Sequence, residues 1–270
     1  MDPLRKYSAS FSVPAILMLL GLLITACSTP IQVKGSSHDH FLFSHPAKTN
    51  SVTTYVTMVY IEGDGVPWIA RGTQPAKDPT PFHPLAYNLF KKTPEAAWYV
   101  TRPCYNRVRD SSCSNQLWTN DRYSEEIVAS MTSVIQTALL KHPSQKLVLV
   151  GYSGGGTLAV LIAPRIQQVI GVITVSGNLD ITAWTTLHGY QPLTGSLNPA
   201  DLAPLTVPVI AMIGDKDSNI PYASLSGFLQ RNPHTIVQQF SEYDHVCCWE
   251  KKWPTLLHSA LANIKLEPTN

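Results

Sequence analysis

The sequence has little charge and almost no excess of either sign. Lysine and arginine number 20, aspartate and glutamate number 18, and charged residues make up 14% of the 270 positions. This balance offers no basic region for a nucleic acid, so we expect no nucleic acid partner. The sequence also lacks internal repeats and a second regime of composition. Its length therefore favours one domain of the larger kind.

The N-terminus carries an apolar run from Val13 to Ile24, which follows Arg5 and Lys6 and ends at small residues before Cys27. A charged segment, a short apolar segment and a small-residue cleavage site are typical of an export signal rather than of a helix that spans a membrane. We therefore predict a signal peptide over residues 1–26.

The last four residues of this signal, Ile-Thr-Ala-Cys at 24–27, resemble the lipobox of bacterial lipoproteins. The resemblance implies that the cysteine thiol is acylated and that Cys27 is the first residue of the mature chain. Ser28 resembles the residue that follows the cysteine in outer-membrane members. We expect a lipid-anchored protein of the bacterial envelope, on the outer membrane and facing the periplasm. A plain secretory signal is the alternative.

Residues 28–40 are polar and lack periodicity, which is typical of a tether. The expected organisation is a lipidated N-terminus and tether over 27–50, followed by one domain over 51–270. His38 and His40 could be metal ligands, but such a pair in a tail is more often solvated. We expect no metal site and no cofactor.

Four cysteines remain after Cys27, and four cysteines allow three pairings in an oxidising compartment. The short separation of Cys104 and Cys113, across a polar stretch, favours a local disulfide. Cys247 and Cys248 would then form a bridge between adjacent residues or stay reduced.

Hydrophobic patterns predict strands and helices in alternation, which implies an α/β fold with a mostly parallel central sheet and helices on both faces. The predicted strands cover residues 53–61, 98–101, 147–150, 169–175, 207–213 and 235–240. The predicted helices cover residues 85–92, 124–141, 154 to about 166, 222–230 and the segment after 253–254. A polar, proline-dotted stretch over 181–205 is long enough to form a lip over a site.

Residues 147–160 hold the strongest motif, a buried strand that meets a glycine cluster with Ser153 in its middle. Gly151, Ser153 and Gly155 form Gly-x-Ser-x-Gly between a predicted strand and helix, the context of a nucleophile elbow. Such a turn needs small neighbours, and it holds the serine hydroxyl above the sheet edge beside a helix N-terminus. We predict that Ser153 is a nucleophile.

A serine nucleophile needs a base and an orienting acid, and residues 52–264 resemble the α/β-hydrolase superfamily in the order Ser, Asp, His. Gly-x-x-Asp-x-x-Ile-Pro at 214–221 resembles the acid loop of that superfamily. The resemblance implies that Asp217 is the acid and His245 the base. Asp180 and His188 are the competing acid and base.

The resemblance also implies an oxyanion hole made by the backbone N–H groups of Gly154 and Asp64. Glu62-Gly63-Asp64 departs from the more common His-Gly-x and places two acidic side chains beside a developing negative charge. Arg102 and Arg122 are candidates for pairing with them.

Three short segments look like an uncharacterised branch of bacterial hydrolase-like lipoproteins: residues 60–65, 102–104 and 245–249. The expected function is that of a serine hydrolase, carboxylesterase-like, which cleaves a small-molecule ester through an acyl-enzyme. Two alternatives are an envelope transacylase with an alcohol acceptor and a non-catalytic lipoprotein that uses the scaffold for binding.

Mass spectrometry of the N-terminal peptide from membrane fractions tests the lipobox. We expect a diacylglyceryl group on Cys27, because the lipobox-like run ends there and a polar stretch follows. A lipid group with more than one acyl chain anchors stably. An unmodified cysteine at position 27 in those fractions would contradict the prediction.

Overall fold

A computed structural model describes residues 29–48, 55–107, 110–143 and 145–264. The predicted signal peptide and Cys27 lie outside the described residues. Among the described residues, no helix combines the length and the apolar character needed to cross a bilayer.

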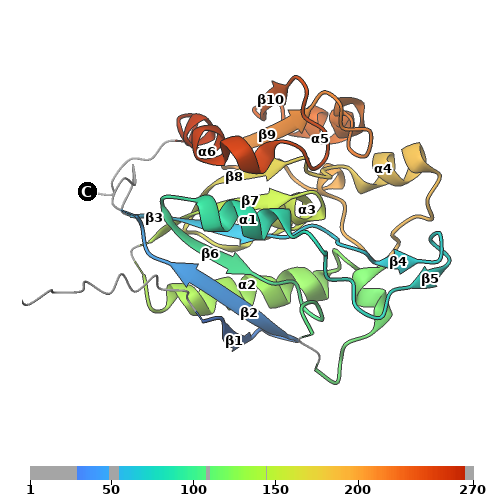
Figure 1. Cartoon of the computed structure of the whole chain (residues 1–270), viewed down its shortest axis with the longest axis horizontal. Helices are drawn as coiled ribbons and strands as arrows, with labels where there is room; N and C mark the ends of the chain where they lie inside the picture. The colour runs from blue at the N-terminus through green and yellow to red at the C-terminus, as the bar shows by residue number, and fades with distance from the viewer. Residues whose placement is uncertain (1–28, 49–54, 108–109, 144, 265–270) are drawn as a thin grey trace, which may run out of the picture.

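The fold is built on an eight-stranded sheet with the strand order β1-β2-β6-β3-β7-β8-β9-β10 (Figure 1). The strands β1 and β2 are antiparallel to their neighbours, and the other six run parallel. The bounds of these strands are Ile31–Lys34 (β1), Asp39–His45 (β2), Val56–Ile61 (β3), Ala96–Val100 (β6), Lys146–Tyr152 (β7), Val169–Val175 (β8), Val209–Gly214 (β9) and Ile236–Phe240 (β10).

Helices cover both faces of the sheet, which confirms the predicted α/β fold. In Figure 1, α1 and α6 lie in front of the sheet, and α2 and α3 lie behind it. The bounds of the α-helices are Leu85–Lys92 (α1), Glu125–Leu139 (α2), Gly154–Ile162 (α3), Ile181–His188 (α4), Ser226–Arg231 (α5) and Trp253–Leu261 (α6).

The central strands are apolar on both sides because both faces are covered. On β3, Val59 and Ile61 pack into the core with α2 and α3. Met58 and Tyr60 point the other way, into the core with α1 and α6. A single apolar strand thereby holds together the two halves of the core.

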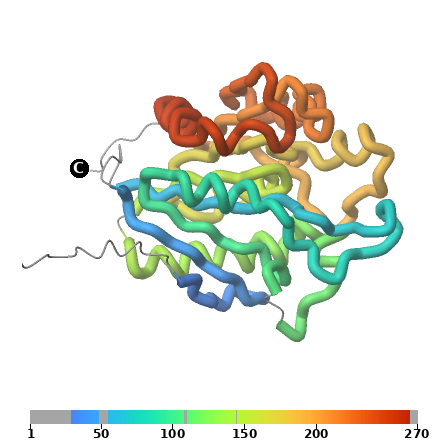
Figure 2. The backbone as a smooth tube through the Cα atoms, in the orientation of Figure 1, coloured from blue at the N-terminus to red at the C-terminus, as the bar shows by residue number. Residues whose placement is uncertain are grey.

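The structure corrects the predicted tether. Residues 31–45 form β1 and β2, and His38 and His40 are buried rather than solvated. The His40 ring is within hydrogen-bond distance of the Thr101 carbonyl and the Ser130 hydroxyl, and burial lowers its pKa to about 4. Figure 2 shows residues 31–45 in blue, alongside α2. The His40 ring is thus paired inside the fold, which a prediction from composition does not detect.

Two segments extend beyond the carboxyl ends of the parallel strands. The proline-rich segment after β3 carries a short hairpin of β4 (Trp68–Ile69) and β5 (Gln74–Pro75). The predicted lip at 181–205 contains α4 and a short 3₁₀ turn at Pro199–Asp201. Both segments lie on the right of Figure 1.

Leu42→Ala tests whether β2 is part of the folded domain. Leu42 is 6% exposed within the core, so its truncation should lower the free energy of unfolding by about 2–3 kcal/mol. Ile31→Ala on β1 is the matched control, because Ile31 is 49% exposed and its loss should change stability by less than about 0.5 kcal/mol. Urea unfolding measures both, and equal small effects would contradict the packing of β2.

Candidate active site

Ser153 occupies a sharp turn between β7 and α3. Its φ angle is 52°, which an L-residue rarely adopts, so the surrounding packing must hold the turn in place. A Cβ atom on Gly151 would collide with the Gly155 backbone, and one on Gly155 would collide with the Ile61 carbonyl. The glycines of the motif therefore permit a close approach of strand and helix that larger residues would prevent.

His245 lies between Asp217 and Ser153. Its Nδ1 is 2.9 Å from Asp217 Oδ2, and its Nε2 is 3.1 Å from Ser153 Oγ. The three residues follow β9, β10 and β7, so the parallel register brings them to one edge of the sheet. The predicted acid, base and nucleophile are thus connected by a chain of two hydrogen bonds.

Backbone hydrogen bonds hold the Asp217 carboxylate in place. Its Oδ1 accepts hydrogen bonds from the backbone N–H groups of Asn219 and Ile220. Burial disfavours the charged carboxylate, but His245 and the N–H of Ile220 outweigh it and keep the pKa of Asp217 below its ordinary value. An ionised Asp217 fixes the imidazole with its proton on Nδ1 and leaves Nε2 free to accept one.

The competing acid and base, Asp180 and His188, contact other residues. Asp180 caps α4 by accepting a hydrogen bond from the Ala183 N–H, and it also accepts one from the Asn198 side chain. His188 Nε2 is 2.8 Å from the Asn219 carbonyl oxygen. The geometry therefore favours Asp217 and His245.

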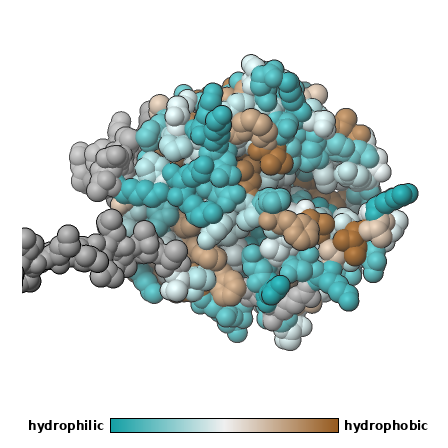
Figure 3. All heavy atoms as spheres, viewed as in Figure 1, coloured by the Kyte–Doolittle hydropathy of each residue, from teal (hydrophilic) through white to brown (hydrophobic). Residues whose placement is uncertain are grey.

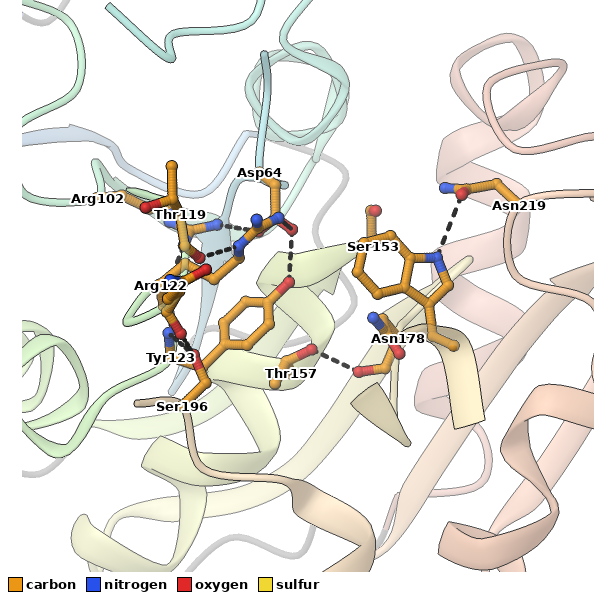
Figure 4. Close-up of polar contacts among 12 residues, drawn as sticks. Asp64, Arg102, Thr119, Arg122, Tyr123, Ser153, Thr157, Asn178, Ser196 and Asn219 are labelled. Atoms are coloured by element: carbon orange, nitrogen blue, oxygen red, sulfur yellow. Dashed lines mark hydrogen bonds and ion pairs between the residues drawn. The ribbon is translucent and has the colours of Figure 1, made fainter. Parts of the chain in front are cut away.

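The Asp64 side chain is paired with both candidate arginines, which confirms the expected pairing for Asp64 but not for Glu62. Arg102 and Arg122 form ion pairs with its two carboxylate oxygens, and the Tyr123 hydroxyl donates a hydrogen bond of 2.6 Å. Figure 4 shows this group on one side of Ser153 and Asn219 on the other. The pKa of Asp64 is about 2, because the two guanidinium groups outweigh the opposing effect of burial.

This pairing changes the electrostatics beside the nucleophile. Asp64, Arg102 and Arg122 together carry one net positive charge, which offsets the negative charge of Glu62 when that side chain is ionised. A Cβ atom on Gly154 would collide with the Asp64 carboxylate, so the two predicted oxyanion-hole residues are in contact. Gly154 begins α3, and the first N–H groups of a helix have no partner within it.

Glu62 directly follows β3 and is buried against the N-terminus of α1. Its carboxylate accepts hydrogen bonds from the N–H groups of Gly63, Ala86 and Tyr87. Burial raises the pKa of Glu62 to about 6, against the effect of these donors. Glu62 therefore anchors the backbone that leads to Asp64.

A cavity of about 800 Å³ opens above Ser153 and His245. Its apolar wall includes Trp68 from the β4–β5 hairpin and Trp184 and Leu193 from the lip. Figure 3 shows apolar side chains gathered over these two segments. On the same segments, four large apolar side chains are exposed, and the last of them also lines the cavity: Ile69, Phe82, Leu187 and Tyr190.

Three side chains of the site were not predicted from the sequence. Tyr123 supports Asp64, while Trp184 and Asn219 line the cavity and are hydrogen-bonded to each other. Asn219 lies within the acid loop, two positions after Asp217, and that position is the one local signal that could have identified it. Tyr123 and Trp184 come from segments whose sequence does not indicate where they meet.

The four cysteines in the described part of the chain form two disulfides. Cys104 is joined to Cys113, and Cys247 is joined to Cys248 across a cis peptide bond. The first disulfide closes the loop that begins just after Arg102. The second begins two positions after His245.

Comparisons with known proteins agree with this architecture. The model of the dienelactone hydrolase family matches residues 93–251, which is more than half of the chain. A comparison with curated protein sequences found no match.

Solved structures with the same fold include several hydrolases. An alpha-beta serine hydrolase homologue from Coxiella burnetii has a TM-score of 0.59 at 14% identity, over 87% of this chain and 96% of that one. A proline iminopeptidase from Mycobacterium smegmatis has a TM-score of 0.64 at 11% identity, over 87% and 97%. An esterase from Pyrococcus furiosus has a TM-score of 0.60 at 9% identity, over 88% and 91%. These likenesses show the fold.

Asp64→Asn should lower the free energy of unfolding at pH 7 by about 3–5 kcal/mol, because it leaves two buried arginines without their counter-charge. Glu242→Gln is the matched control. It breaks the exposed pair with Lys216 and should cost less than about 1 kcal/mol.

The difference between the wild type and Asp64→Asn should also depend on pH. The folded pKa of Asp64 lies near 2, below its ordinary 3.8, so its stabilising effect is complete above about pH 4 and is lost as the pH falls towards 2. Urea unfolding at several pH values measures the difference. A difference that stays constant from pH 7 to pH 2 would show that the ionised carboxylate is not responsible.

Proposed function

The chain belongs to the dienelactone hydrolase family of the α/β-hydrolase superfamily, and from this premise we propose that it is a serine hydrolase that cleaves esters through an acyl-enzyme on Ser153. The observation that carries the proposal is the position of His245, with Asp217 at one ring nitrogen and Ser153 at the other. Nucleophile, base and orienting acid are then present in one connected unit.

The first half of the reaction follows from these contacts. His245 Nε2 takes the proton of the Ser153 hydroxyl as Oγ attacks the ester carbonyl, and Asp217 stabilises the resulting imidazolium. The N–H groups of Gly154 and Asp64 stabilise the oxyanion, and the positive balance of the Asp64 cluster favours the charge that develops there. Collapse of the tetrahedral intermediate transfers the proton from Nε2 to the leaving alcohol.

The second half regenerates the enzyme. Water replaces the alcohol in the cavity, gives a proton to His245 Nε2 and attacks the acyl group on Ser153. Collapse of this second tetrahedral intermediate breaks the bond between Oγ and the acyl group, returns the proton from Nε2 to Oγ and releases the carboxylic acid. The aromatic wall made by Trp68 and Trp184 suits an ester with a bulky apolar group on its acyl or alcohol side. A small-molecule ester is thus the favoured substrate.

We also propose that the enzyme works in the bacterial envelope, held to the outer membrane by a lipid on Cys27 and facing the periplasm. The lipobox-like sequence at 24–27 supports the anchor. The two disulfides support an oxidising compartment, because such bonds persist outside the cytosol.

Alanine at Ser153 or His245 should lower kcat on an ester by about 10⁴-fold or more, and the double mutant should lose little beyond that, because the two residues act as one unit. Asp217→Asn should leave more activity, since Asp217 orients the imidazole without bonding to the substrate. A panel of p-nitrophenyl esters of graded acyl length, run on the protein without its lipid, measures these losses.

Two substitutions test the competing assignment. Asp180→Asn and His188→Ala should retain most of the activity, because neither side chain contacts Ser153 or the Asp217–His245 pair. If these two variants are crippled while Asp217→Asn and His245→Ala are spared, the assignment of acid and base is wrong. Full ester hydrolysis by Ser153→Ala would refute the serine mechanism.

A further inference from the structure

The Asn219 side chain connects the lip of the cavity to His245. Its Oδ1 accepts a hydrogen bond of 3.3 Å from the indole N–H of Trp184, and its Nδ2 lies 3.2 Å from His245 Nε2. Figure 4 shows the first of these contacts as a dashed line that ends on Asn219. Asn219 and Trp184 both line the cavity.

Trp184 determines which end of the amide faces His245. An indole N–H can only donate a hydrogen bond, so it requires the amide oxygen of Asn219 as its acceptor. The amide nitrogen, a donor, is thereby directed towards Nε2. In the reverse orientation two donors would face each other at Trp184.

The amide donor has a different effect on each protonation state of His245. Asp217 holds the ring proton on Nδ1, so the neutral imidazole presents a lone pair at Nε2. Ser153 Oγ and Asn219 Nδ2 both lie within hydrogen-bond distance of that lone pair. When Nε2 carries a proton, the Asn219 N–H loses its acceptor and faces another donor.

We propose that Asn219 is a positioning residue that keeps His245 in the deprotonated form needed for the base, and that the Trp184 indole fixes the Asn219 amide for this role. The inference rests on the proposed function, because it concerns the protonation of the same histidine. The lip then has a second role besides lining the cavity, because Trp184 of α4 orients the Asn219 amide that faces His245.

Other groups near His245 remain in place when Asn219 is changed. Asp217 faces Nδ1, and the Tyr152 ring packs against the imidazole with centroids 5.3 Å apart. Asp244, the preceding residue, accepts hydrogen bonds from the N–H groups of Val246 and Cys247. Alanine at position 219 also keeps the backbone N–H that donates to Asp217. The substitution therefore removes the amide alone.

The test is the rate at which a fluorophosphonate labels Ser153, measured from pH 4 to pH 9. The acid limb of this profile reports the protonation of the base and requires no knowledge of the substrate. For Asn219→Ala the limb should move to higher pH by about half a unit to one unit, the equivalent of one hydrogen bond lost from the neutral imidazole.

Two further variants should form a series with Asn219→Ala. Asn219→Asp should move the acid limb further, because a carboxylate accepts from the protonated Nε2 and favours it. Trp184→Phe keeps an aromatic ring but loses the N–H, so the amide can turn and the limb should move in the same direction by less. Asn263→Ala, at an exposed position just after α6, is the matched control and should leave the profile unchanged.

The outcomes separate this inference from the function on which it rests. Acid limbs of Asn219→Ala and Trp184→Phe that coincide with that of the wild type, or that move to lower pH, overturn the role of Asn219 and leave the serine hydrolase intact. If the wild type and all variants fail to react with the fluorophosphonate at every pH, the proposed function fails and the inference fails with it.

Discussion

The close approach of α3 to the ends of β3 and β7 is the constraint on which the site depends. Gly155 lies against the Ile61 carbonyl, and Gly151 lies against the backbone of Gly155. This contact forces the turn at Ser153 and aims the helix N-terminus at the space above it. It also brings the end of β3, and with it Asp64, to the side of Gly154. Nucleophile and predicted oxyanion hole therefore have one geometric origin.

Charge is distributed around this turn in two groups. Asp217 and His245 lie on one side, where the imidazole connects the carboxylate to Ser153. Asp64 lies on the other side, with its charge more than compensated by Arg102 and Arg122. The first group can take a proton from Ser153, and the second can tolerate negative charge nearby. Such a division is what acyl transfer requires.

The sequence predicted the central part of the fold because its strands are buried on both faces and its helices follow a regular apolar period. The helix over 85–92 and the strand over 169–175 were predicted with their exact bounds. The acid, base and nucleophile could be placed because a short motif follows each of three parallel strands, and those strand ends meet at one edge of the sheet.

The remainder of the structure depends on contacts between distant segments. His38 and His40 suggested a solvated tail, since nothing near them in the sequence shows that His40 meets Thr101 and Ser130. The α4 helix was missed because its sequence is short and rich in threonine, and its boundaries come from the Asp180 cap and from Gly189 in a left-handed conformation. The contact of Trp184 with Asn219 likewise exists only in the folded chain.

The most direct test of the central claim is the acyl-enzyme itself. The protein is mixed with a p-nitrophenyl ester, quenched in acid within the first turnovers, digested and analysed by mass spectrometry. The account predicts that the acyl group is attached to Ser153 and that the adduct is absent from Ser153→Ala. Ester turnover without an adduct on Ser153, or with the acyl group on another residue, would contradict it.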